Sequence, residues 1–198
     1  MVDVGSATGV VAELDPRVER SRRIILEAVL DELGEVGYGA LTIEAVAARA
    51  GVGKSTIYRH WPGKLELVED AFRTLKASVE IPDEGPLRDR VVAVIEQVAC
   101  LVAQSTYSAC MPALIDAAER DPKVREFHCR FSAERRAALV GLLREAIEAG
   151  EVAATADPEL LADALVGPIL LRRLMLGQTV GPEVARELVD QLLPVAGD

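Results

Sequence analysis

The sequence predicts an all-α fold, with a small three-helix unit followed by a larger helical domain. Hydrophobic residues make up 50% of the chain and aromatic residues only 4%. Ala, Leu, Val and Glu dominate, and this composition favours helix over sheet. Apolar residues recur at helical spacing, and Pro or Gly marks most segment ends. Alternating runs of β-branched residues long enough for a strand are absent from the sequence.

The first domain is expected over residues 15–80, after a flexible arm of small and polar residues at 1–14. An Asp-Pro pair begins a helix expected over residues 16–36, and Gly37 is expected to end it. A helix over 64–78 is expected to link this domain to the next one.

The stretch from residue 41 to 64 predicts two short helices joined by a tight turn. Thr42 is the N-cap candidate, and Gly51 can adopt the left-handed backbone of the turn. In the second helix, Ile57 is the one strongly apolar inward residue, whereas most of its neighbours are hydrogen-bond donors. Such a helix suits a groove lined with phosphates and base edges, so the pattern indicates a DNA-binding helix-turn-helix.

Polar side chains of this stretch are expected to contact DNA. Lys54 and Ser55 come first in the second helix and are expected at base edges. The remaining candidates carry hydroxyl, imidazole or ammonium groups that suit phosphates. They are Thr42, Thr56, Tyr58, His60 and Lys64. Core packing is the alternative for Tyr58, and Glu44 is expected to favour the helix start rather than to accept from cytosine.

The order of residue types here resembles the tetracycline-repressor (TetR) family of bacterial regulators. The matching elements are Gly-Tyr-x-x-Leu-Thr, Ile-x-x-Val-Ala-x-x-Ala-Gly-Val and Thr-Ile-Tyr-x-His-Trp-x-x-Lys, between Gly37 and Lys64. The resemblance covers residues 17–72. It implies a homodimeric transcriptional regulator whose ligand shifts the two DNA-reading heads apart. A dimer would read double-stranded DNA with a near-palindromic operator.

The charge distribution is compatible with DNA binding despite a net charge of −10. Residues 16–65 hold eight basic and six acidic residues, a net charge of +2, so the remainder carries −12. A local basic face is sufficient for DNA. A cluster of arginines near the first helix start either contacts phosphates or forms a solvated face. Its members are Arg17, Arg20, Arg22 and Arg23.

The second domain is expected over residues 81–198. Pro and Gly punctuation predicts helices over 87–105, 107–120, 122–149, 157–177 and 181–193. Pro112 is expected to kink its helix or to delay its start. The last two helices carry apolar residues on more than one face, which predicts a two-fold dimer interface, with an intramolecular core as the alternative.

The resemblance also implies a ligand pocket among the middle helices. The few aromatic and polar residues in these helices indicate that a small inducer would be largely apolar. Met, Cys, Gln and aromatic side chains are the lining candidates, although plain core packing is the alternative for each. These candidates are Cys100, Gln104, Tyr107, Met111, Phe127, Phe131 and Met175. Arg172 and Arg173 interrupt an apolar helix, and ion pairing at the surface or at the dimer rim is expected for them rather than an acidic ligand.

Other classes of protein fit less well. The two histidines, His60 and His128, have no suitable nucleophile, glycine loop or zinc quartet around them, so neither an enzyme nor a cofactor or metal is expected. The three cysteines are expected to be buried thiols in a cytoplasmic protein. Neither a signal peptide nor a membrane span is expected. A ligand-independent regulator and a helical interaction module without DNA binding stay open as alternatives.

Overall fold

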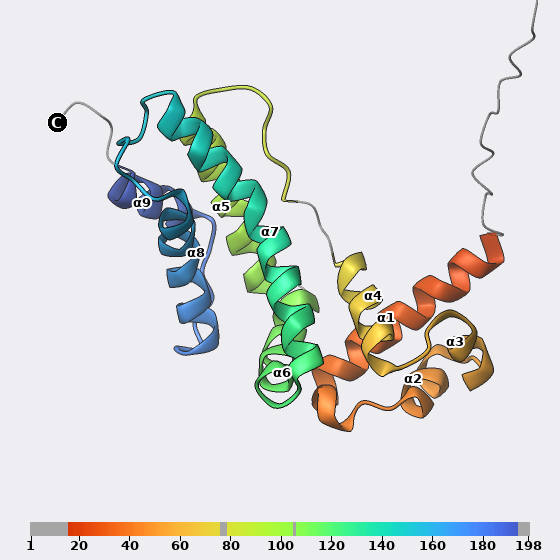
Figure 1. Ribbon diagram of the computed structural model, residues 1–198. Coiled ribbons are helices and arrows are strands. Elements are labelled where there is room, and N and C mark those ends of the chain that lie inside the picture. Colours follow the sequence, from red (N-terminus) through yellow and green to blue (C-terminus); the bar gives the residue numbers. More distant parts are fainter. Residues whose placement is uncertain (1–15, 76–78, 105, 194–198) are drawn as a thin grey trace, which may run out of the picture.

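A computed structural model describes residues 16–75, 79–104 and 106–193, and all regular structure in these ranges is helical. The flexible arm expected over 1–14 lies outside them. The helices are α1 (Pro16–Ala40), α2 (Ile43–Ala50), α3 (Lys54–His60), α4 (Lys64–Thr74), α5 (Leu87–Gln104), α6 (Thr106–Arg120), α7 (Pro122–Glu148), α8 (Pro158–Leu174) and α9 (Glu183–Leu192). Helices α1–α4 form one end of the molecule, and α8 and α9 lie at the other end (Figure 1).

The local signals in the N-terminal segment act as expected. Gly37 has φ 77° and interrupts the helical backbone inside α1, so the chain turns there toward α2. Thr42 Oγ1 accepts a hydrogen bond from Ala45 N at 3.1 Å and caps α2. Gly51 ends α2 with φ 66°, a left-handed conformation that glycine adopts at little steric cost.

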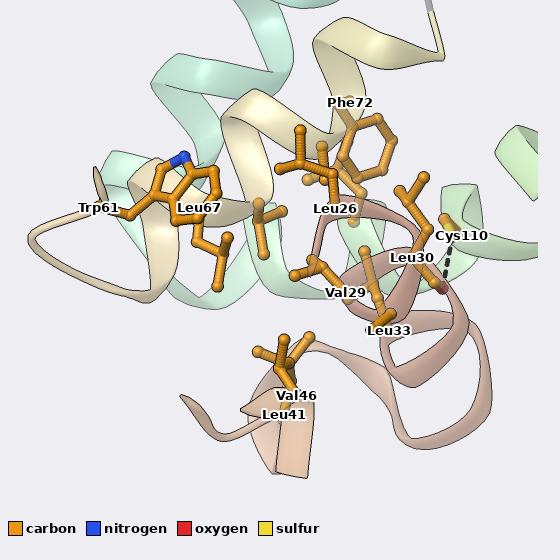
Figure 2. Close-up of a cluster of buried hydrophobic side chains, with 14 of the residues drawn as sticks. Leu26, Val29, Leu30, Leu33, Leu41, Val46, Trp61, Leu67, Phe72 and Cys110 are labelled. Atoms are coloured by element: carbon orange, nitrogen blue, oxygen red, sulfur yellow. Dashed lines mark hydrogen bonds between the residues drawn. The ribbon is translucent and has the colours of Figure 1, made fainter. Parts of the chain in front are cut away.

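The core of the N-terminal end extends into the second domain. Leu26, Leu30 and Leu33 of α1 pack with Phe72 of α4 (Figure 2). Residues of α6 and α7 complete this cluster, and Cys110 of α6 donates its thiol to Leu30 O at 3.2 Å. Helices α1–α4 therefore do not enclose their core alone, because one side of it is formed by α6 and the start of α7.

A second core holds the C-terminal helices together. It is formed by buried residues of α5, the second half of α7, α8 and α9, and it includes Ile95, Leu143, Leu165 and Val189. Arg88 of α5 adds polar contacts to this end, with the carboxylate of Asp190 and the backbone carbonyl of Leu193. Helices α8 and α9 are thus fixed to α5 and α7.

Some elements differ from the expectation. Helix α4 ends at Thr74 rather than at residue 78, and α8 ends at Leu174 rather than at 177. Pro112 neither breaks nor delays α6, which runs without interruption around it. Pro112 is the seventh residue of α6, past the first turn, so the helix continues there without the N–H that would bond to the carbonyl of residue 108.

The expectation of buried thiols is wrong for two cysteines. Cys110 is buried, but Cys100 and Cys129 are exposed on the outer faces of α5 and α7. Helical spacing alone does not say which face of a helix a neighbouring helix covers.

In the described ranges, no single helix has the length and apolar composition of a membrane span. Leu87–Ala103 and Thr106–Arg120 pass that test only as a pair, across a bend of 76°.

Candidate DNA-binding surface and ligand pocket

Helix α3 presents polar side chains outward and is held by a single buried residue. Ile57 is 0% exposed and is the only buried residue of α3. Lys54, Ser55 and His60 are exposed, Tyr58 is 53% exposed, and Thr56 is half-buried. The expected DNA contacts on α3 are therefore at least partly accessible to solvent, and Tyr58 is not a core residue.

Trp61 fixes the end of α3 to α4. Its ring is buried, and Nε1 donates to Asp70 Oδ2 at 2.9 Å. The same carboxylate oxygen accepts from Arg22 of α1 at 2.6 Å. Asp70 thus joins α1, α3 and α4. Arg22, one of the arginines considered for phosphate contact, is already engaged within the protein.

Arg49 holds α2 against α1. Its guanidinium contacts Glu35 through two nitrogens, at 3.0 and 2.5 Å, and Nε donates to Glu32 at 3.0 Å. Glu32 is buried, so the guanidinium supplies the charge partner that a buried carboxylate needs. The hydrogen bond from Arg49 also lowers the pKa of the Glu35 carboxyl.

Lys54 has an acidic partner on α2. Its Nζ lies 2.9 Å from Glu44 Oε1, and both side chains are more than half exposed. The hydrogen bond raises the pKa of Lys54 and lowers that of Glu44. Thr42 Oγ1 caps α2, and a backbone hydrogen bond of Glu44 also lowers the pKa of its carboxyl. Glu44 therefore contributes a negative charge beside the surface expected to face DNA.

Lys64 has a structural role that the sequence did not reveal. Its Nζ donates to the carbonyls of Tyr38 at 2.8 Å and Leu41 at 3.2 Å, and it lies 4.4 Å from the centroid of the Tyr38 ring. Burial lowers the pKa of this ammonium. The charge at the start of α4 thus satisfies carbonyls released where α1 ends. Phosphate contact by Lys64 stays a prediction, but it is not needed to explain the lysine.

A cavity of about 210 Å³ lies among α5, α6, α7 and α8. Its walls are mostly aliphatic and come from α5 and α8, with Val79 from the preceding linker. The polar lining groups are Tyr107, Ser132, Arg135, Arg136 and Asp163. Five α7 residues line it, at 132, 135, 136, 138 and 139, and four of these, 132, 135, 136 and 139, form one helical face.

Among the expected lining residues whose side chains the structure describes, only Tyr107 borders this cavity. Met111 is buried in the C-terminal core, whereas Phe127 and Phe131 belong to the N-terminal core. Cys100 is exposed, and Met175 is 76% exposed. The side chain of Gln104 lies outside the described parts of the structure.

Phe127 and Phe131 lie away from this cavity for a physical reason. The ring of Phe72 lies 5.9 Å from that of Phe127 and 5.5 Å from that of Phe131, so these aromatic residues fill the junction between α4 and α7. Valine and arginine line the cavity instead. The sequence signal for this lining is the helical stripe at 132, 135, 136 and 139, which carries two guanidinium groups and no aromatic or Met side chain.

Arg173 does not form the expected ion pair. Its Nε donates to Ser108 Oγ at 2.9 Å, which joins α8 to α6 across the inside of the domain. Arg172 is exposed. Within the described ranges no acidic side chain pairs with either guanidinium.

Helix α8 has an exposed apolar stripe. Leu160, Leu171 and Met175 are 66%, 53% and 76% exposed. Eleven residues make about three helical turns, so Leu160 and Leu171 lie on the same face of α8, and Met175 extends it by one turn. Ala164 and Gly167 occupy the middle of this face. Within α9, the partly buried Val184, Leu188 and Leu192 follow at spacings of four.

Among the described residues, no three His, Cys, Asp or Glu side chains form a cluster that could hold a metal ion.

Both halves of the chain match sequence profiles of one family. Residues 25–71 match "Bacterial regulatory proteins, tetR family", and residues 81–192 match "Tetracyclin repressor-like, C-terminal domain". The uncharacterised HTH-type transcriptional regulator YdeS of Bacillus subtilis is 34% identical over 176 residues, which cover 88% of each chain. A DNA-binding transcriptional repressor TetR of Mycobacteroides abscessus is 31% identical over 182 residues, covering 90% of this chain and 95% of that one.

Solved structures agree with these matches. The TetR-family regulator SCO0332 aligns with a TM-score of 0.67 at 31% identity, over 88% of this chain and 97% of that one. FadR of Bacillus subtilis, in complex with stearoyl-CoA, aligns with a TM-score of 0.74 at 18% identity, over 87% and 97%. The second likeness shows the fold alone. Together with its all-helical architecture, these matches show that the chain belongs to the TetR family of DNA-binding, non-enzymatic transcriptional regulators.

Proposed function

We propose that this regulator is a cytoplasmic homodimeric repressor that binds a near-palindromic operator and is released by a small, largely apolar molecule. The observation that carries the DNA-binding part is the presentation of α3. Its donors face solvent while Ile57 is fully buried behind them. Lys54 and Ser55 lie at the start of α3 and are proposed at base edges, and Tyr58 and His60 at phosphates, with Thr42 and Thr56 as further phosphate contacts.

Dimerisation is proposed through α8 and α9. The exposed stripe of α8 is apolar at both ends and small in the middle, at Ala164 and Gly167, so a second α8 can approach closely. An isologous contact would bury Leu171 and Met175 of both protomers. Because α3 and α8 lie at opposite ends of the molecule, this interface leaves both α3 helices accessible (Figure 1).

The cavity supports control by a ligand. Tyr107 borders it, and the Tyr107 ring lies 6.4 Å from that of Phe72 on α4. Helix α4 in turn holds α3 through Asp70 and Trp61. A ligand that moves Tyr107 therefore acts on packing that positions α3. The ligand would shift the population toward a conformation in which the α3 helices no longer match the half-site spacing. The alternative of a regulator without ligand control would not require a cavity at this place.

DNA binding is tested by a mobility-shift titration with the DNA that flanks the gene, at several salt concentrations. We expect specific binding that weakens as salt rises, by about 0.9 in log K per phosphate contact for each tenfold increase in salt. Tyr58→Ala should weaken it, because the ring is exposed and its loss leaves the core intact. A protein that binds no such DNA specifically would support the alternative of an interaction module.

Sedimentation velocity tests the dimer. Leu171→Glu should shift the protein toward a monomer, because it places a charge in the proposed interface. Val36→Glu changes an equally apolar and 45% exposed residue of α1, outside that interface, and should leave the dimer unchanged. A dimer that tolerates Leu171→Glu as well as Val36→Glu would contradict the proposed interface.

A further inference from the structure

The polar side of the cavity distinguishes among ligand classes. Arg135 and Arg136 of α7 line it together with the aliphatic side chains Val94, Val98 and Val102 of α5. The site therefore combines apolar surface with two guanidinium groups and the carboxylate of Asp163. The two guanidinium groups differ in whether acidic side chains already neutralise them.

Arg136 is neutralised inside the protein. It forms ion pairs with Glu159 and with Asp163, the latter at 2.8 Å from Nε to Oδ1. The Nε atom is nevertheless fully buried without a hydrogen bond, since the Asp163 oxygen lies near it but outside hydrogen-bonding geometry. The charge of Arg136 therefore has partners, while one of its donors is unused.

Arg135 has aromatic partners instead of acidic ones. Its guanidinium carbon lies 4.6 Å from the centroid of the Tyr107 ring and 5.5 Å from that of Phe131. Among the residues that the structure describes, no carboxylate lies within ion-pairing distance of Arg135. A cation on ring faces gains less than one in a charge-assisted hydrogen bond, so its donors stay available to an anion.

We propose that the cavity binds a small amphiphilic carboxylate, with the carboxylate on Arg135 and the hydrocarbon body against α5 and α8. This rests on the proposed role of the cavity as the ligand site. A volume of about 210 Å³ is below the range of about 300–1,000 Å³ usual for ligand pockets, which favours a free acid over a large conjugate. A single unneutralised guanidinium matches one negative charge, and its planar fork suits a carboxylate.

The position of Arg135 also suggests how binding is transmitted. A carboxylate that engages this guanidinium competes with the ring of Tyr107 for it, and Tyr107 packs edge-on against Phe72 of α4. The contact that changes on binding is therefore adjacent to the helix that holds α3.

Isothermal titration of the full-length protein with octanoate, 1-octanol and octylamine tests the ligand class, since these probes share a chain and differ in charge. Octanoate should bind at least about tenfold more tightly than octanol, a difference of about 1.4 kcal/mol, and octylamine should bind most weakly. Hexanoate and decanoate show how chain length fits the cavity. Equal binding of the three eight-carbon probes, or no binding of octanoate, would overturn the proposal.

Variants of α7 test the residue. Arg135→Met should abolish the preference for octanoate over octanol, whereas Arg135→Lys should keep part of it. Arg144→Met removes an exposed guanidinium of the same helix and should bind octanoate as the unaltered protein does. An octanoate preference that survives in Arg135→Met would overturn the assignment. Circular dichroism shows whether each variant is folded. If a variant does not fold, the order of affinities of the three eight-carbon probes for the unaltered protein decides the ligand class.

A mobility-shift titration of the unaltered protein, run in parallel, separates the two proposals. DNA binding without octanoate binding would overturn the carboxylate proposal and leave the regulator proposal standing. Octanoate binding without operator binding would overturn the regulator proposal and leave the carboxylate proposal standing.

Discussion

Replacing Ile57 by Ala tests the claim that one buried side chain holds α3 in place. Ile57 is 0% exposed, and α3 is only seven residues long, with no side-chain cap at its N-terminus. Truncating a fully buried Ile to Ala costs about 2–5 kcal/mol. For a chain of this size, about 3 kcal/mol lowers Tm by roughly 6–12 °C.

The same substitution should reduce operator affinity. If the whole cost of about 3 kcal/mol falls on the docking of α3, the population of correctly placed α3 decreases by up to about 100-fold, and the apparent affinity falls with it. Ile57→Val removes one methylene, costs about 1 kcal/mol and should have a small effect on both quantities.

The assays are thermal unfolding followed by circular dichroism and operator binding by mobility shift, both well below the lowered Tm. Tyr58→Ala is the matched control on the same helix, because Tyr58 is 53% exposed. It should weaken DNA binding while Tm changes little. An Ile57→Ala protein with unaltered Tm and operator affinity would refute the reasoning, since α3 would then be held by something other than this contact.

Two further predictions concern charge. Glu44→Gln removes the acidic partner of Lys54, so operator affinity should rise several-fold in a mobility-shift titration. Glu126→Gln on α7 is the control and should leave the affinity unchanged. A fall in affinity for Glu44→Gln would mean that Glu44 itself accepts a hydrogen bond from a base. Burial raises the pKa of the Cys110 thiol from 9.0 to about 11. Because the unfolded thiol ionises first as pH rises, the free energy of unfolding should decrease between pH 9 and about 11, by at most about 2–3 kcal/mol. Urea unfolding against pH checks this, and Cys110→Ala should lack that part of the decrease.

Local signals were sufficient to predict the DNA-reading end. Thr42, Gly51 and the Asp-Pro helix starts act within a few residues of themselves, through caps and left-handed turns, so their outcome does not depend on the rest of the fold. Tyr58 is exposed, as expected for a donor on a helix whose one buried residue is Ile57. The structure agrees with each of these expectations, whereas the DNA contacts themselves stay predictions.

The position of the cavity could not be predicted in the same way. It depends on which faces of α5, α7 and α8 meet, and helical periodicity does not specify how helices pack against each other. Met175 is an example, because a residue expected to line a pocket lies on the exposed stripe proposed for dimerisation. Lys64 is a second example, since its carbonyl partners at 38 and 41 are more than 20 residues earlier in the chain.

The role of Lys64 changes which substitutions report on DNA binding. Lys64→Ala would remove a phosphate candidate and also two hydrogen bonds to carbonyls where α1 ends. A loss of operator affinity in this variant would therefore have two explanations, whereas Tyr58→Ala has one.

The shared core limits how the protein can respond to a ligand. Because α6 and α7 complete the core of α1 and α4, with Cys110, Phe127 and Phe131 inside it, α1–α4 cannot rotate alone without exposing apolar surface. Such exposure costs about 25 cal/mol per Å², so a rotation that carries part of α6 along is less costly than one that separates the two domains. The cavity borders the same two helices, at Tyr107 and Arg135. Under the proposed function, a ligand there would bias the position of α6, and the α3 helix would follow through α4.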